Sequence, residues 1–164
     1  MRRCEEPNVT PSMLSIHGRW SMSMRILGVD YGTKRIGIAI TDEHGIIAQP
    51  FMSIRNDGDE RAARKIAEIA HAHKVSLIVV GIPRRTDGKK GVMEERSISF
   101  ASLLGELSGL RVELFDERFT TAIAERLLLE ADLSRQKRKR LRDKVAAAIM
   151  LQSYIQSLRE TNER

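Results

Sequence analysis

The sequence RILGVDYGTKRIGIAIT, residues 25–41, is the most informative part of this chain. It holds two short runs rich in β-branched and apolar residues, Arg25–Tyr31 and Arg35–Thr41, on either side of a tight glycine-containing turn. This pattern predicts a β-hairpin. A third strand is expected around Ile46–Ile54. Pro50 within it predicts a place at the edge of a sheet, because proline cannot donate a ladder hydrogen bond.

The remainder of the chain alternates helical and extended patterns. Residues 59–73 carry Ala62, Ile66 and Ala70 at helical spacing, and residues 76–80 (SLIVV) form the apolar run of a buried parallel strand. The elements expected after these are a loop at 81–91, a helix to about Leu107, a strand at 111–115, and helices at 120–131 and 136–158. We therefore predict an α/β fold with a mixed five-stranded sheet, in the order 3-2-1-4-5, and helices on both faces.

The composition is that of one folded, soluble domain, with 164 residues of which 41% are hydrophobic and 30% charged. No stretch approaches the ~20 consecutive apolar residues that span a bilayer, so no membrane partner is expected. Cys4 is the only cysteine, which excludes an internal disulfide, argues against a thiolate zinc site and is consistent with a reducing cytoplasm.

Residues 1–23 differ from the rest of the chain. They contain two of the four prolines and the only tryptophan, and they show no sustained periodicity. We expect them to be a disordered extension or a segment upstream of the true start, and we place the domain at residues 24–160.

The net charge of +6 is concentrated in one segment. Residues 134–144 hold seven cations and a single acid, Asp143, so this segment accounts for the whole net charge. A cationic patch on an otherwise neutral body favours contact with nucleic acid. We predict that Arg138, Lys139 and Arg140 make that contact. The alternative is a solvated helix face without a ligand.

Asp30 places a carboxylate at the end of an otherwise apolar strand. A charge there is costly unless it is paired, hydrogen-bonded or bound to a metal. The alternative is that Asp30 caps the tight turn through Gly32 and Thr33.

Further acids support a functional role for Asp30. Asp116 and Glu117 follow the apolar strand at 111–115, and Asp143 lies in the last helix. The alanines after Asp143 are small enough to let that helix approach the sheet. Strand alternation sends Asp116 and Glu117 to opposite faces, and we prefer Glu117 as the ligand, leaving Asp116 in the turn or in a supporting place. Asp143 could instead form a local ion pair with Lys139 or Lys144.

Three carboxylates brought together from Asp30, Glu117 and Asp143 would supply hard oxygen ligands for Mg²⁺ or Mn²⁺. Such ions can activate water and stabilise the oxygens of a phosphoryl displacement. Two loops beside the predicted site are basic, and we expect nucleic-acid contacts from Lys34, Arg35, Arg84, Arg85, Lys89, Lys90 and Arg118. The loop at 81–91 lacks Walker A spacing and has a plain surface loop as its alternative.

Four motifs stand in order between residues 24 and 158. They are Asp30-x-Gly32-x-x-Arg35-x-Gly37, Gly81-x-Pro83 with Asp87-Gly88, Asp116-Glu117-Arg118-x-Thr120-Thr121, and Asp143-x-x-Ala146-Ala147. Together they resemble the YqgF (RuvX) family. The resemblance implies a ribonuclease-H-like fold and a nuclease related to the RuvC Holliday junction resolvases, with the acidic positions at Asp30, Asp116, Glu117 and Asp143.

The resemblance further implies an enzyme of the bacterial cytoplasm that processes the 5′ end of precursor 16S rRNA. Two alternatives remain open, a Holliday junction resolvase-like DNase and a non-catalytic RNA-binding adaptor. Residues 30–33 also resemble the phosphate motif of actin-like ATPases and sugar kinases, but those enzymes close two such domains around ATP and this chain has room for one. Structured nucleic acid is the expected partner, and the sequence does not separate monomer from homodimer.

Overall fold

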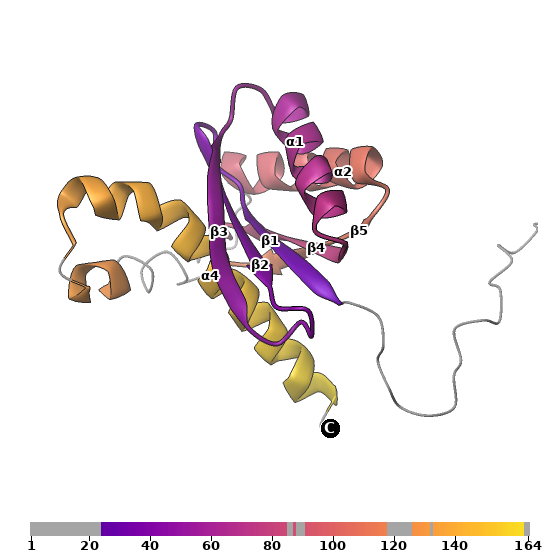
Figure 1. Ribbon diagram of the computed structural model, residues 1–164. Helices are drawn as coiled ribbons and strands as arrows, with labels where there is room; N and C mark the ends of the chain where they lie inside the picture. Colours follow the sequence, from indigo (N-terminus) through magenta and orange to yellow (C-terminus); the bar gives the residue numbers. More distant parts are fainter. Residues whose placement is uncertain (1–23, 85–86, 88–90, 118–125, 132, 163–164) are drawn as a thin grey trace, which may run out of the picture.

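The computed structural model describes residues 24–84, 87, 91–117, 126–131 and 133–162. Its labelled elements are, in chain order, β1 (Arg25–Asp30), β2 (Arg35–Thr41), β3 (Ala48–Arg55), α1 (Asp59–Ala72), β4 (Val75–Ile82), α2 (Val92–Ser108), β5 (Arg111–Asp116) and α4 (Arg135–Asn162) (Figure 1). Residues 126–130 are also helical. The predicted extension, residues 1–23, lies outside the described residues.

The five strands form one mixed sheet in the order β3-β2-β1-β4-β5, which confirms the predicted topology. β1 pairs antiparallel with β2 and parallel with β4, and β5 extends the parallel half. Pro50 lies in edge strand β3, opposite Ala39 at a register shift. β3 starts at Ala48 because the amides of Ile46 and Ile47 donate to the Asp42 carboxylate, at 2.7 and 2.8 Å, and so belong to the preceding turn.

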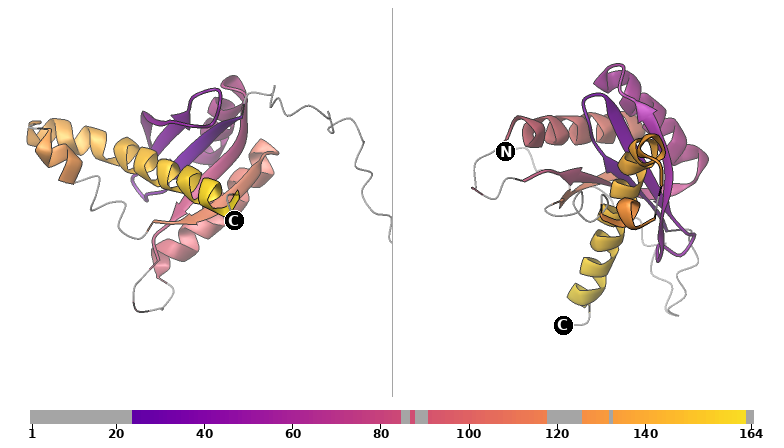
Figure 2. Two further views of the ribbon diagram at one scale, coloured as in Figure 1. Left: turned by 90° about the horizontal axis from the view of Figure 1, so that it is seen from below. Right: turned by 90° about the vertical axis from the view of Figure 1, so that its left-hand side faces the viewer.

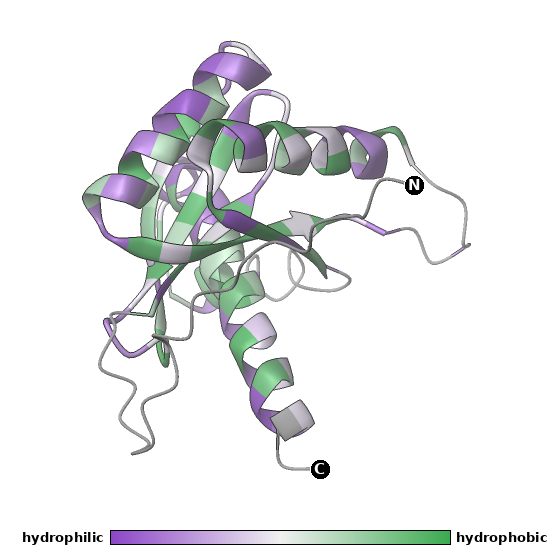
Figure 3. Ribbon diagram, turned by 90° about the vertical axis from the view of Figure 1, so that its right-hand side faces the viewer, coloured by the Kyte–Doolittle hydropathy of each residue, from purple (hydrophilic) through white to green (hydrophobic). Residues whose placement is uncertain are grey.

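One face of the sheet is covered by α1 and α2, as Figures 1 and 2 show from three directions. Hydrophobic residues dominate the strands, whereas both helices alternate hydrophobic and hydrophilic residues (Figure 3). Ile66 of α1 and Leu104 of α2 are fully buried against Leu27, Val29 and other strand residues of this core. The helical spacing in residues 59–73 therefore corresponds to the buried stripe of α1.

The other face is covered by α4, which confirms that helices lie on both faces. The helix approaches the sheet closely at two glycines. A Cβ on Gly28 of β1 would lie 2.8 Å from Leu151 Cβ, and a Cβ on Gly37 of β2 would overlap the backbone carbonyl of Asp143. The buried Ala146 and Ala147 allow this approach, as expected from their size.

The N-terminal half of α4 extends beyond the sheet, beside the helical residues 126–130 (Figure 1, left). The sequence predicted a helix at 120–131, of which residues 120–125 lie outside the described residues. Among the described helices, none has the combined length and apolar character that a membrane crossing needs.

Candidate active site

Asp30 lies at the carboxyl end of the central strand and faces α4. Leu27 and Val29 belong to the core under α1 and α2, so the alternation of β1 turns Gly28 and Asp30 toward the opposite face. Asp30 stands in register with Gly37 of β2.

Glu117 follows β5 and reaches the same face. Its backbone amide donates to the carbonyl of Ile82 at 3.0 Å, which continues the pairing of β5 with β4 by one residue. Its carboxylate lies directly over Gly81, where a Cβ would overlap it. Phe115 belongs to the core under α4, so alternation also places Glu117 on the α4 face and Asp116 on the other.

The carboxyl groups of Asp30 and Glu117 lie close enough for each to shift the pKa of the other. Burial, together with the neighbouring charges of Asp30 and Asp116, raises the pKa of Glu117 to about 9. Burial also raises the pKa of Asp30 to about 6, with a smaller contribution from the charge of Asp143. Two acids in contact within a low-dielectric site disfavour their joint ionisation, so this pair is suited to share a proton or a cation.

Asp143 comes to this site from α4, and its charge is felt by Asp30. Its ion-pair partners among the described residues are Arg35 of β2, at 3.2 Å, and Arg142 of α4, at 3.7 Å. The alternative interpretation of the sequence paired Asp143 with Lys139 or Lys144, and neither lysine forms that ion pair among the described residues. The backbone of α4 at Asp143 lies directly against Gly37 of β2, two residues from Arg35. This contact between distant parts of the chain brings the Arg35 side chain within reach of the Asp143 carboxylate.

The turn after Asp30 is held by a small hydrogen-bond network. The Tyr31 hydroxyl donates to the Asp59 carboxylate at 2.9 Å. The Asn56 side-chain amide donates both to the Gly32 carbonyl and to Asp59, each at 3.0 Å. These bonds connect the β1–β2 turn to the start of α1, and they hold in place the backbone that follows Asp30.

The carboxylates of Asp30 and Glu117 are ligands of the chemical type that a divalent cation prefers. Asp30 and Glu117 offer carboxylate oxygens in contact with each other, and hard cations such as Mg²⁺ prefer these ligands. Within the described residues no group of three His, Cys, Asp or Glu side chains is arranged to hold a metal ion. The Asp143 carboxylate is instead directed to Arg35 and Arg142.

The predicted basic residues are found in several settings. Lys34 is exposed, Arg35 pairs with Asp143, and the Arg84 guanidinium lies 3.8 Å from the buried Glu94 carboxylate. Arg85, Lys89, Lys90 and Arg118 lie outside the described residues. Within the basic segment, Arg138 donates to the Leu133 carbonyl at 2.6 Å, and Lys139 and Arg140 are exposed.

Two residues at this site were not predicted from the sequence. Gly81 provides the flat surface under Glu117, and Arg142 lies close enough to lower the pKa of Asp30. In the sequence Gly81 marked the start of a loop and of the Gly81-x-Pro83 motif, without a role beside the acids. Arg142 was one cation among seven, although its position directly before Asp143 was a usable signal.

Comparison with known proteins gives close sequence relatives. Over 132 residues the chain is 49% identical to a protein of Endomicrobium trichonymphae named "Putative pre-16S rRNA nuclease", which covers 80% of this chain and 94% of that protein. A protein of the same name from Clostridium acetobutylicum is 41% identical over 135 residues, covering 82% of this chain and 100% of that one.

Solved structures with the same fold are more distant in sequence. Thermus thermophilus RuvC in complex with Holliday junction substrate matches with a TM-score of 0.55 and 14% identity, over 84% of this chain and 97% of that one. The Fowlpox virus Holliday junction resolvase matches with a TM-score of 0.52 and 18% identity, over 82% and 99%. These matches confirm the predicted ribonuclease-H-like fold.

The RuvX family, described as Holliday junction resolvase, matches residues 24–157. That range contains the four motifs, the whole sheet and the residues Asp30, Glu117 and Asp143. Because the match covers most of the chain and the sequence relatives exceed 40% identity, the chain belongs to the RuvX family.

Proposed function

We propose that the chain is a divalent-metal-dependent endonuclease of the bacterial cytoplasm that hydrolyses phosphodiester bonds in structured nucleic acid. The observation that carries this proposal is the direct interaction of Asp30, from β1, with Glu117, from the end of β5, with Asp143 of α4 near enough for its charge to raise the pKa of Asp30. Three acids from distant parts of the chain are costly to gather there, and a bound cation offsets that cost.

Each acid has a separate part in the proposal. Asp30 and Glu117 would hold Mg²⁺ or Mn²⁺, and Asp143 would be the third ligand, from α4. A bound ion would supply an activated water and neutralise charge on the phosphoryl oxygens. Asp116 supports Glu117 from the neighbouring position, where its charge already raises the pKa of Glu117.

The proposed substrate is the 5′ end of precursor 16S rRNA, which places the protein in ribosome biogenesis. The sequence relatives at 41–49% identity carry the pre-16S rRNA nuclease name, whereas the resolvase structures are 14–18% identical and indicate the fold alone. Cleavage of branched DNA is the second candidate, which the description of the family favours.

The metal dependence can be tested with the full chain. A precursor 16S rRNA fragment and a four-way DNA junction would each be incubated with the protein in Mn²⁺, in Mg²⁺ and in EDTA. We expect the RNA to be cleaved with either ion and left intact in EDTA, because the metal-activated water would then be missing. Cleavage in EDTA would refute the metal dependence. Cleavage of the junction alone would favour the resolvase, and RNA binding without any cleavage would favour the adaptor.

Gly81→Ala is expected to lower the cleavage rate by about a hundredfold, the loss that accompanies a displacement of about 1 Å at a reacting centre. The new methyl group would occupy the place of the Glu117 carboxylate and separate it from Asp30. Gly105→Ala is the matched control, since its methyl would meet Val112 Cγ2 at 3.5 Å, an ordinary contact. Single-turnover rates and melting curves would be measured for both variants. A Gly81→Ala protein with the rate of the control would contradict this role of Gly81.

A further inference from the structure

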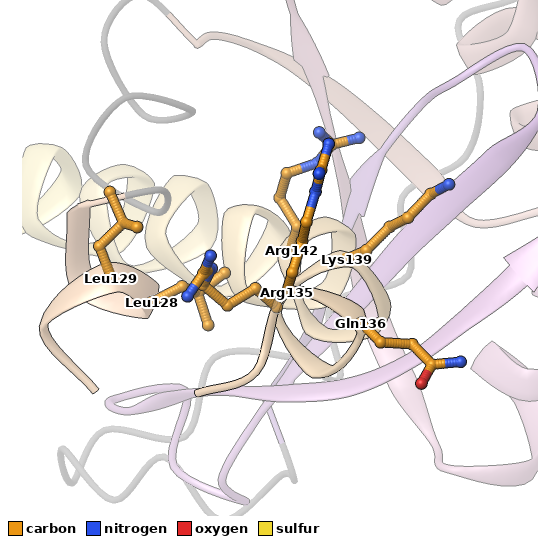
Figure 4. Close-up of a pocket in the computed structure, with 7 residues that line it drawn as sticks. Leu128, Leu129, Arg135, Gln136, Lys139 and Arg142 are labelled. Atoms are coloured by element: carbon orange, nitrogen blue, oxygen red, sulfur yellow. The ribbon is translucent and has the colours of Figure 1, made fainter. Parts of the chain in front are cut away.

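A pocket of about 740 Å³ lies between the helical residues 126–130 and the N-terminal half of α4. Its lining combines two leucines from the first helix with a polar and cationic face of the second (Figure 4). The lining residues are Leu128, Leu129, Arg135, Gln136, Arg138, Lys139 and Arg142. The volume lies within the range of ligand-binding pockets.

The cations of this pocket form a row along one side of α4. Arg135, Lys139 and Arg142 are separated by four and three residues, the spacing that brings helical side chains to one face. All three are exposed. Arg138 also faces the pocket, but its guanidinium donates to the Leu133 carbonyl, so it holds the turn before α4 in place. Lys137 and Arg140 do not line the pocket.

The row of cations leads into the acidic site. Arg142 lines the pocket and also lies 3.7 Å from the Asp143 carboxylate, and its charge lowers the pKa of Asp30. A polyanion that follows Arg135, Lys139 and Arg142 therefore arrives at the carboxylates, and cations in this position offset the repulsion between a phosphate and those acids.

The leucines give the pocket an apolar side. Leu129 is 60% exposed, while its neighbour Leu128 is buried. Nucleic-acid-binding proteins use leucine as a wedge against unstacked bases. An apolar surface opposite a row of cations matches a nucleotide, whose base has flat faces that pack on apolar groups and whose phosphate is an anion.

We infer that this pocket binds an unpaired nucleotide that flanks the scissile phosphate, with its base against Leu129 and its backbone phosphates along Arg135, Lys139 and Arg142. The inference rests on the proposed function in taking the ligand to be nucleic acid. It adds a substrate class, namely nucleic acid with an unpaired segment beside the cleavage position. It also assigns the phosphate contacts to the cations of the pocket and not to the other cations of the basic segment.

Binding measured in EDTA tests the inference without any cleavage. The probes are a fully paired RNA duplex and the same duplex ending in an unpaired strand, with affinities followed over a range of salt concentrations. Lys139→Gln is expected to reduce the salt slope for the overhang probe by roughly 0.7–0.9, the value of one lost phosphate contact. The matched control, Lys137→Gln, removes the same charge two positions away and is expected to leave the slope unchanged. Equal slopes for the two variants would overturn the proposed phosphate path.

A second pair of variants tests the base contact. Leu129→Ser is expected to weaken binding of the overhang probe roughly fivefold, by loss of part of a leucine's apolar contact, and to leave the duplex affinity unchanged. Leu127→Ser is the control, because Leu127 is 49% exposed on the same helix and does not line the pocket. Equal effects on both probes, or no effect, would overturn the base contact. Because these measurements exclude metal, they are independent of whether the wild-type protein cleaves RNA.

Discussion

Replacing Asp30 with Asn is expected to lower metal-dependent cleavage by at least about a thousandfold, a loss within the range seen when one member of a catalytic unit is removed. Asparagine keeps the shape of the side chain and its contact with Glu117 but removes the negative charge that a divalent ion requires. The β1 backbone would be unaffected, since Asp30 pairs in register with Gly37 through main-chain groups. The rate should be measured with saturating Mn²⁺ on the precursor rRNA fragment.

The same variant has a second readout that does not depend on activity. Metal that binds only the folded protein stabilises it, by about 2.7 kcal/mol at a concentration a hundred times its Kd. We expect Mn²⁺ to raise the Tm of the wild type and to leave the Tm of Asp30→Asn unchanged.

Without metal, we expect the Tm of Asp30→Asn to equal or exceed the Tm of the wild type. The substitution removes a carboxylate whose charged form is disfavoured by burial. Asp57→Asn is the control, since Asp57 is an exposed acid in a surface ion pair with Arg55. Equal cleavage rates for Asp30→Asn and this control would refute the assignment of Asp30.

Gly37→Ala is expected to lower the free energy of unfolding by about 3 kcal/mol, the upper part of the range for overpacking a core. The added methyl group would overlap the backbone carbonyl of Asp143. A backbone group within a helix cannot turn aside as a side chain can, so α4 must move away from β2 along its contact.

The loss of stability in Gly37→Ala should be measured by urea denaturation beside Gly105→Ala. The control adds the same methyl group inside α2, where alanine is favoured over glycine, so its stability should be unchanged or slightly raised. A Gly37→Ala protein as stable as the wild type would show that α4 can lift from the sheet at little cost. The position of Asp143 would then be less firmly defined than the close contact indicates.

Much of the fold follows from local patterns in the sequence. The β-branched runs and Pro50 were sufficient for the β3-β2-β1 half of the sheet and for the edge position of β3, because these strands are consecutive in the chain. The parallel pairing of β1 with β4 joins strands far apart in the chain, and it was predicted from the general rules for crossover connections. Strand alternation indicated that only one of Asp116 and Glu117 would be a ligand and did not decide which; the preferred residue, Glu117, does lie on the face of Asp30. Its role as a metal ligand stays a prediction.

The details that the sequence did not predict depend on contacts between distant segments. Asp143 pairs with Arg35, 108 positions earlier, because α4 crosses β2 at a glycine. No periodicity within residues 134–144 could indicate which cation would reach that carboxylate. In the same way, the basic segment was one run of charges in the sequence, and only the packing of residues 126–130 beside it distinguishes Lys139 from Lys137.

The close contact between α4 and Gly37 restricts insertions and deletions in this helix. The contact fixes the rotation of α4 about its own axis at Asp143, and successive side chains of an α-helix are rotated by about 100° about that axis. One residue inserted between Lys139 and Asp143 would therefore turn the upstream cations about a quarter of the way round the helix relative to the acids. Substitutions in this stretch alter one side chain each, whereas an insertion or deletion changes the direction of all of them. We accordingly expect α4 to vary in composition among related chains while the spacing from Arg135 to Ala147 stays constant.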